Sequence, residues 1–96
     1  MFIYVIGPKI GHQKIGISNN VERRLKAIQT GNPEKLYIHH TEPVNPKIVM
    51  IMERAIHREL NHKKQKGEWF SLTPEEARDF VIFFNIRYAD DPLFGI

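Results

Sequence analysis

The chain has 96 residues, of which 42% are hydrophobic and 26% charged, a composition typical of one globular domain and not of a disordered chain. It contains no cysteine, which excludes disulfides and thiolate metal sites and fits a reducing, cytoplasmic location. Residues 1–73 carry 12 Lys and Arg against 6 Asp and Glu, whereas residues 74–96 carry 2 against 5. This asymmetry indicates either an anionic partner for the body of the chain or a basic solvated surface. The first residues lack the basic start of a signal peptide, and no apolar run approaches the roughly 20 residues of a membrane span, so we expect no membrane contact.

The first predicted element is a β-hairpin. Residues 2–6 and 14–17 are apolar runs rich in β-branched residues, and Gly7-Pro8 stops the first of them. Side chains alternate along a strand, so one set is expected to face the core: Ile3, Val5, Ile15 and Ile17. Tyr4, Lys14 and Gly16 then share the other face. We expect Gly16 to leave open space there.

Three helices and a third strand follow. Asn19 with Glu22 predicts a capping box for a helix that ends at Gly31-Asn32-Pro33. Residues 36–41 predict a strand. Asn45-Pro46 predicts the start of a helix that ends near Asn61.

A basic loop over residues 61–67 and a short extended segment, 68–72, are expected next. Thr73-Pro74-Glu75-Glu76 then predicts a last helix over residues 74–89, ended by Asp90-Asp91-Pro92. The element order predicts an α+β fold, in which helices flank a small central antiparallel sheet of about three strands. We expect one domain over residues 1–96, with a core of about residues 2–72 and the C-terminal helix beside it.

Each polar residue that could carry chemistry also has an ordinary structural explanation. A strand Tyr such as Tyr4 is usually a packing residue, and a strand Lys such as Lys14 usually protects a sheet edge. Arg23 and Arg24 fit a solvated helix face. Glu53 and His57, four residues apart, fit a surface ion pair and a border residue of the helix. Singly, these structural explanations are favoured.

Taken together and in order, the motifs resemble the GIY-YIG endonuclease superfamily. The resemblance spans about residues 2–72 and rests on Ile3-Tyr4, Lys14-Ile15-Gly16, Arg24 and Glu53. The segments Gln29-Thr30-Gly31-Asn32-Pro33 and Gly67-Glu68-Trp69-Phe70 look like the branch found in phage and bacterial proteins and in fungal meiotically up-regulated proteins. The chain departs from the family pattern where Phe2 replaces the first Gly, Lys14 the second Tyr, and Ile28 a polar residue after the Arg.

The resemblance implies hydrolysis of nucleic-acid phosphodiesters, with DNA as the favoured substrate. Tyr4 would accept a proton from the attacking water, and Lys14 would favour the phenolate or contact the phosphate. Arg24 would bind the non-bridging oxygens, and Glu53 would hold one Mg²⁺ or Mn²⁺. His57, one helical turn on, would orient a metal-bound water, bind phosphate or position Glu53.

Partners remain open at this stage. Five basic residues are candidates for phosphate contacts: Arg23, Lys26, Lys63, Lys64 and Lys66. No sequence-specificity module is evident, so cleavage is either weakly selective or directed by a protein partner. Trp69 and Phe70 are expected to anchor the core against the second helix. The alternatives to a nuclease are a catalytically weak nucleic-acid-binding module on the same fold and a protein-interaction domain using the last helix or Leu93-Phe94-Gly95-Ile96, as a monomer or homodimer.

Overall fold

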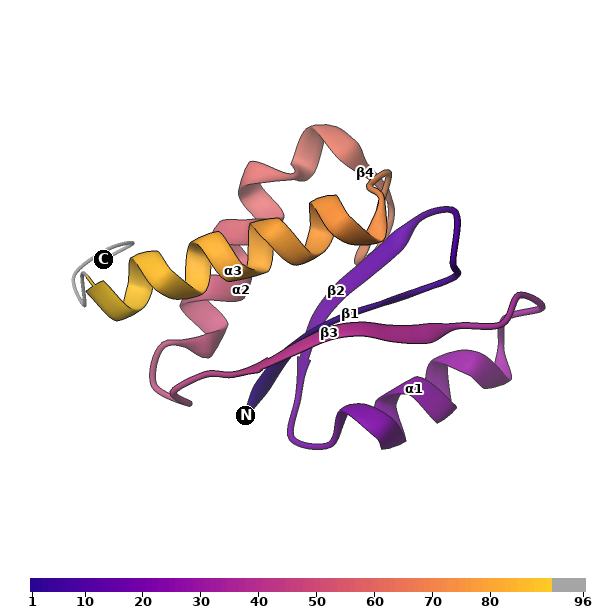
Figure 1. Ribbon diagram of the computed structural model, residues 1–96, viewed down its shortest axis with the longest axis horizontal. Helices are drawn as coiled ribbons and strands as arrows, with labels where there is room; N and C mark the ends of the chain where they lie inside the picture. The colour runs from indigo at the N-terminus through magenta and orange to yellow at the C-terminus, as the bar shows by residue number, and fades with distance from the viewer. Residues whose placement is uncertain (91–96) are drawn as a thin grey trace.

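An antiparallel sheet of five strands, in the order β3-β1-β2-β5-β4, forms the centre of the computed structural model, which describes residues 1–90 (Figure 1). The elements in chain order are β1 (Phe2–Gly7), β2 (Gln13–Ser18), α1 (Val21–Thr30), β3 (Tyr37–Pro43), α2 (Val49–Glu59), the 3₁₀ helix η1 (Asn61–Lys63), β4 (Lys64–Lys66), β5 (Trp69–Phe70) and α3 (Pro74–Asp90). The predicted α+β class is confirmed, with five strands in place of about three. β4 and β5 have three and two residues, too few to produce a periodic sequence pattern.

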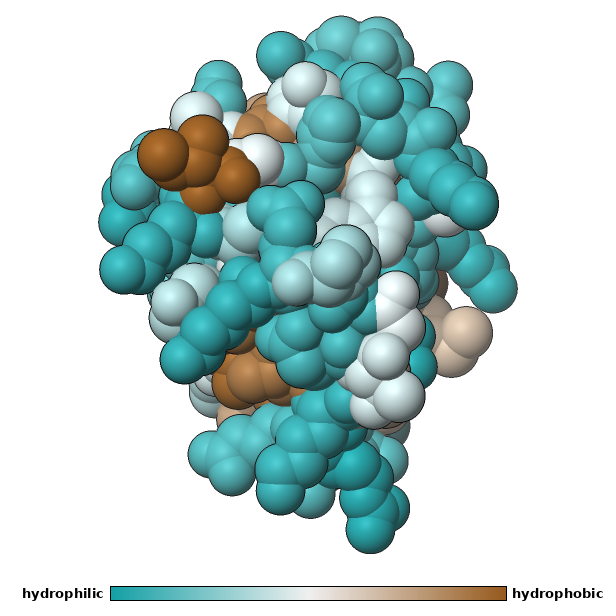
Figure 2. Space-filling view, turned by 90° about the vertical axis from the view of Figure 1, so that its right-hand side faces the viewer, coloured by the Kyte–Doolittle hydropathy of each residue, from teal (hydrophilic) through white to brown (hydrophobic). Residues whose placement is uncertain are grey.

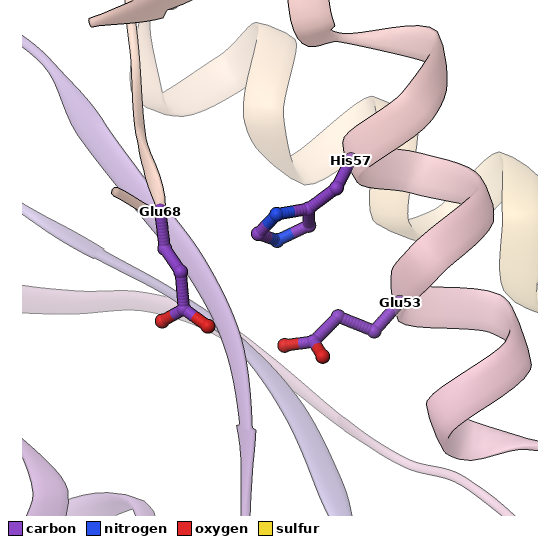
Figure 3. Close-up of side chains that lie close together, drawn as sticks. All are labelled: Glu53, His57 and Glu68. Atoms are coloured by element: carbon purple, nitrogen blue, oxygen red, sulfur yellow. The ribbon is translucent and has the colours of Figure 1, made fainter. Parts of the chain in front are cut away.

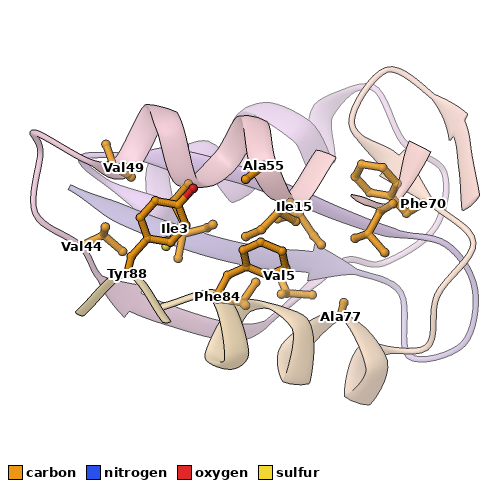
Figure 4. Close-up of a cluster of buried hydrophobic side chains, with 14 of the residues drawn as sticks. Ile3, Val5, Ile15, Val44, Val49, Ala55, Phe70, Ala77, Phe84 and Tyr88 are labelled. Carbon is orange, nitrogen blue, oxygen red and sulfur yellow. The ribbon is translucent and has the colours of Figure 1, made fainter. Parts of the chain in front are cut away.

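Helices cover both faces of the sheet. α2 and α3 lie on one face and α1 on the other (Figure 1). Ile3, Val5 and Ile15 are fully buried in the cluster beneath α2 and α3 (Figure 4), and Ile17 packs against it in part. Tyr4 belongs to the second cluster, on the α1 side. The predicted alternation of the hairpin is therefore confirmed.

The start of α1 differs from the prediction by one residue. Asn20, not Asn19, is the N-cap, and its side chain accepts a hydrogen bond from the Arg23 backbone N–H at 3.0 Å. Asn20 itself is held by a hydrogen bond from its backbone N–H to the Ser18 hydroxyl at 3.0 Å. Two adjacent Asn residues carry the same capping chemistry, so the local pattern does not distinguish them.

α2 begins three residues later than its sequence signal suggests. The Asn45 side chain accepts from the Lys47 backbone N–H at 2.9 Å, and the Asn45 carbonyl accepts from Ile48 and Val49. These bonds close a turn before the helix. Asn-Pro therefore starts the turn that leads into α2, because Asn stabilises both turns and helix starts by the same type of side-chain bond.

The two aromatic residues of β5 point to opposite faces of the sheet. Phe70 is fully buried under α2, and its ring meets the His57 ring edge-on at a centroid distance of 4.9 Å. Trp69 packs instead against the cluster on the α1 side. The predicted packing against the second helix is confirmed for Phe70 and wrong for Trp69, because consecutive strand residues cannot share a face.

α3 starts as predicted. The Thr73 backbone N–H donates to Glu76 Oε1 at 2.9 Å, and the Glu76 backbone N–H donates to Thr73 Oγ1 at 3.1 Å. Residues 91–96, which include the predicted stop at Asp91-Pro92 and the apolar Leu93-Phe94-Gly95-Ile96 segment, lie outside the described residues. None of the helices formed by residues 1–90 is both long and apolar enough to cross a bilayer.

Candidate active site

The predicted catalytic residues meet at the edge of β2 that β5 leaves uncovered. β5 pairs only with Gln13 and Lys14 of β2. Beyond this point α2 approaches the same edge, and His57 Nε2 lies 2.9 Å from the Ile15 carbonyl oxygen. Side chains from both faces of the sheet reach each other here, although α1 and α2 lie on opposite faces (Figure 1).

Tyr4 lies at the centre of the sheet and is only 1% exposed. The Arg24 Nε–H donates to its hydroxyl oxygen at 3.3 Å, which joins α1 to β1. Gly16 faces Tyr4 across the β1–β2 pair, and a Cβ atom on Gly16 would clash with the Tyr4 hydroxyl and lie 2.7 Å from Tyr4 Cζ. The expected open space beside Gly16 is therefore wrong. Because Gly16 has no side chain, the Tyr4 hydroxyl occupies the space beside it.

The pKa of Tyr4 is raised above its ordinary value of 10.0. Burial is the main cause, and the negative charges of Glu68 and Glu53 add to it, while the hydrogen bond and charge of Arg24 lower it. Tyr4 is therefore a neutral phenol at pH 7. Because Arg24 donates to the oxygen, the phenolic proton is available to another acceptor.

Lys14 is already paired with a carboxylate. Its Nζ lies 3.1 Å from Glu68 Oε1 and 5.6 Å from the centroid of the Trp69 ring. The Lys14 side chain is only 11% exposed, so the pair is partly shielded from water. Glu68 Oε1 would also lie 3.2 Å from a Cβ on Gly16, which places this carboxylate beside Tyr4.

Sequence reasoning missed Glu68 as a site residue. The signal for it was its position in Gly67-Glu68-Trp69-Phe70, a motif that we used only for the family resemblance. Trp69 pairs with Lys14 in the sheet, and the Glu68 carbonyl accepts from the Ile15 backbone N–H at 3.3 Å. This pairing brings Glu68 against β2.

Glu53 and His57 lie one turn apart on α2 and are both partly buried. Glu53 Oε2 is inaccessible to solvent and has no hydrogen-bond partner within residues 1–90. Burial raises the pKa of Glu53, and the charge of Glu68 raises it further, while His57, Lys14 and Arg54 lower it. A carbonyl oxygen only accepts, so His57 Nε2 carries a proton toward Ile15, and the neutral ring keeps its lone pair on Nδ1.

Glu53, His57 and Glu68 converge from α2 and the β4–β5 turn (Figure 3). One ligand atom from each lies within 4.8 Å of the others. The two carboxylates suit Mg²⁺ or Mn²⁺, which prefer oxygen ligands, whereas an imidazole nitrogen is more typical of later transition metals. The unpartnered Oε2 of Glu53 fits a cation, which would satisfy the atom that the protein leaves without a partner.

The five predicted phosphate-contact residues lie outside this cluster but on segments next to it. Arg23 and Lys26 are exposed on α1, the helix that carries Arg24. Lys63 ends η1 and is partly buried, and Lys64 and Lys66 are exposed on β4, just before the turn that carries Glu68. The site thus has basic side chains on both of its flanking segments.

The family model of the T5orf172 domain matches residues 1–85. This domain occurs in phage and bacterial nuclease-like proteins and is related to the GIY-YIG and HNH types, but the match is not to the GIY-YIG family itself. No curated protein and no solved structure matches significantly. The comparison supports a nuclease-like or nucleic-acid-related role, without a specific activity or catalytic residues.

Proposed function

Because this chain belongs to the T5orf172 domain family, we propose that it is a divalent-metal-dependent endonuclease with a GIY-YIG-type site and with DNA as its main substrate. One observation carries the proposal: residues from β1, β2, α1, α2 and the β4–β5 turn converge at one edge of the sheet. Two cationic side chains, a phenol, an imidazole and two carboxylates can together activate a water and stabilise the charge that develops in phosphodiester hydrolysis.

Arg24 and Lys14 hold the phosphate in this proposal. The Nε of Arg24 is used by Tyr4, which fixes the guanidinium and leaves its terminal nitrogens for two non-bridging oxygens. Lys14 exchanges its contact with Glu68 for one with the substrate. The positively charged side chains of Arg24 and Lys14 then stabilise the negative charge that develops on the phosphorane.

Glu53 would hold the divalent metal ion, with Glu68 as a second oxygen ligand. A bound Mg²⁺ or Mn²⁺ supplies a Lewis acid that withdraws charge from the phosphate and the leaving oxygen. His57 is fixed by the Ile15 carbonyl and by the Phe70 ring, so its imidazole is held in one orientation beside the two carboxylates. We assign His57 a positioning role.

Tyr4 takes the proton of the attacking water at its hydroxyl oxygen, which requires the phenolate. In the free protein, burial and the charges of Glu68 and Glu53 oppose this form. A divalent cation held by Glu53 and Glu68 would offset both negative charges, which otherwise raise the pKa of Tyr4. The hydrogen bond from Arg24 also favours the phenolate. The active form therefore gains population as the pH rises, so we expect the cleavage rate to increase with pH above neutrality.

The test is cleavage of plasmid DNA, and of RNA, by purified protein with Mg²⁺ or Mn²⁺ at several pH values. We expect Glu53→Gln, Arg24→Ala and Tyr4→Phe to lose activity by at least about 100-fold. Lys47→Ala, which removes one exposed cation from the turn before α2, is the matched control and should retain most of it. Equal cleavage by the site variants, or no cleavage of any substrate, would exclude the nuclease.

One observation favours the second candidate, a nucleic-acid-binding module without catalysis: Lys14 is neutralised by Glu68. For that function, binding should fall steeply with salt and should not depend on a divalent cation. A filter-binding or fluorescence titration with and without EDTA separates the two functions. Metal-dependent binding that is lost in Glu53→Gln supports the enzyme.

A further inference from the structure

The Glu68 carboxylate stands between two parts of the candidate site. Its Oε1 lies 3.1 Å from Lys14 Nζ. One of its oxygens also lies within 4.8 Å of a ligand atom of Glu53 and one of His57 (Figure 3). The carboxylate that would help to hold a metal ion is therefore the same one that neutralises the lysine proposed to hold the phosphate. Within residues 1–90, no other carboxylate forms an ion pair with Lys14.

The Lys14–Glu68 pair is partly shielded from water. The Lys14 side chain is 11% exposed, and its ammonium lies over the Trp69 ring, 5.6 Å from the ring centroid. The backbone of Glu68 is held against β2, because its carbonyl accepts from the Ile15 backbone N–H at 3.3 Å. Partly buried charges are screened by salt much less than exposed ones. The pair therefore persists until another charge competes for the carboxylate.

The charges of the site cancel when no metal ion is bound. Arg24 and Lys14 supply the positive charges, and Glu53 and Glu68 supply the negative ones. A phosphate that approaches this site meets no excess of positive charge. A divalent cation between the two carboxylates would reverse this balance, and its charge would repel the nearby Lys14 ammonium.

We propose that the Lys14–Glu68 pair makes the binding of nucleic-acid phosphate conditional on a divalent cation. Without the cation, Glu68 keeps Lys14 from the substrate, and with the cation Lys14 is released to contact a phosphate. This inference rests on the proposed function, because it describes how the same site is regulated. Glu68 is thus a positioning residue that acts through Lys14. By linkage, the cation and the phosphate increase each other's affinity by the same factor.

The first test is the binding of a short fluorescein-labelled DNA duplex in EDTA, where no metal-dependent cleavage occurs. Glu68→Gln should bind the duplex at least about fivefold more tightly than wild type, because its Lys14 is free to contact phosphate. Glu53→Gln is the matched control. It removes the same charge from the same site but leaves the Lys14–Glu68 pair in place, so its gain should be smaller.

Lys14→Met shows whether the gain depends on Lys14. In the wild-type background and in EDTA, this substitution should change duplex binding little, since Lys14 is already neutralised. Combined with Glu68→Gln it should remove the gain, because the two substitutions act on one pair. Circular dichroism shows whether each variant is folded. Additive effects of the two substitutions would overturn the proposal, and so would a Glu68→Gln gain no larger than that of Glu53→Gln.

The second test uses Trp69, the only tryptophan of the chain, as a reporter of Lys14. When the ammonium leaves its place over the ring, the electric field at the indole changes, and with it the emission wavelength. Mg²⁺ alone should therefore shift the emission of wild type and leave that of Lys14→Met unchanged. Calorimetry under the same conditions measures whether Mg²⁺ binds.

The two measurements separate this proposal from the proposed function. Binding of Mg²⁺ without a shift of the Trp69 emission in wild type would overturn the release of Lys14 and leave the metal site intact. Absence of Mg²⁺ and Mn²⁺ binding would overturn both. A shift in wild type that is lost in Lys14→Met, together with the gain of Glu68→Gln in EDTA, supports the proposal whether or not the duplex is cleaved.

Discussion

At the scale of single residues, the candidate site places charges together that oppose one another when no ligand is bound. Glu53 and Glu68 approach each other at the edge of β2, and each raises the pKa of the Tyr4 hydroxyl. Lys14 compensates only Glu68 directly. Such an arrangement costs stability in the free protein and is typical of sites that bind a cation or a phosphate.

Glu53→Gln should therefore stabilise the metal-free protein. Because the folded-state pKa of Glu53 is raised above its ordinary 4.5, its charged form destabilises the fold at pH 7, and this cost disappears once the carboxyl is protonated in acid. We expect the melting temperature of the variant in EDTA to exceed that of wild type by a few degrees at pH 7. The difference should vanish near pH 4.

Thermal unfolding followed by circular dichroism at both pH values is the measurement. Glu34→Gln, which removes the same charge from an exposed loop position, is the control and should change little. A variant that melts below wild type at pH 7 would mean that the Glu53 carboxylate is stabilising, contrary to its burial.

Five residues of the site were identifiable from sequence, namely Tyr4, Lys14, Arg24, Glu53 and His57, and Glu68 was not. Tyr4, Lys14, Arg24 and Glu53 stand in family motifs, and the structure brings them to one edge. Glu68 depends on the pairing of a two-residue strand with β2, which local patterns do not encode.

At the scale of elements, α3 has the clearest helix-start signal in the sequence, and it also contributes a large share of the core side chains. Its first turn is closed by the reciprocal bonds of Thr73 and Glu76, and its inner face packs on the sheet beside α2 (Figure 4). The N-cap therefore holds the helix at the point where the chain leaves β5. Loss of the cap should destabilise the whole fold, because α3 packs on the sheet and most helical stability in a protein comes from such packing.

Thr73→Ala should lower the free energy of unfolding by about 1 kcal/mol, which corresponds to a fall in melting temperature of about 4–8 °C for a domain of this size. The Thr73 backbone N–H and, to a smaller extent, its side chain bond the Glu76 carboxylate and lower its pKa below 4.5, so the stabilisation by this carboxylate is present above that pH and is lost as the pH falls through the lowered pKa. Thr73→Ala removes only the side-chain bond. The deficit of the variant should shrink in acid.

Denaturant unfolding at pH 7 and at pH 3 measures both effects. Ser71→Ala is the control, since Ser71 is an exposed hydroxyl residue two positions before the cap. A Thr73→Ala deficit of the same size at both pH values would mean that the Thr73 side chain stabilises the helix only through the bond that it accepts from the Glu76 backbone N–H, and not through the Glu76 carboxylate.

At the scale of the whole molecule, the basic body and the acidic α3 segment suit different partners. The surface that includes the β1–β2 turn is mainly hydrophilic with isolated apolar patches (Figure 2). The basic residues next to the site lie on α1, η1 and β4, whereas α3 carries Glu75, Glu76 and Asp79. A nucleic acid at the site would therefore extend over α1 or β4 and away from α3.

Lys66→Ala should weaken DNA binding and make it less dependent on salt. Each lost phosphate contact lowers the slope of log K against log salt by about 0.9 for duplex DNA. Lys47→Ala removes one exposed charge from the turn before α2 and is the matched control. Binding titrations at four or more salt concentrations measure the slope, and identical slopes for the two variants would show that β4 does not contact the backbone.

The amino-acid sequence alone determined the hairpin, the existence of the three helices, the faces of β1 and β2, and the residues that resemble a nuclease site. These features depend on alternation, helical period and caps, which act between residues close in the chain. Only the tertiary structure decided where Glu68 lies, which aromatic residue of β5 is buried under α2, and that Tyr4 fills the space beside Gly16. Those outcomes depend on strand register and on contacts between distant segments, because pairing across the sheet determines which side chains meet.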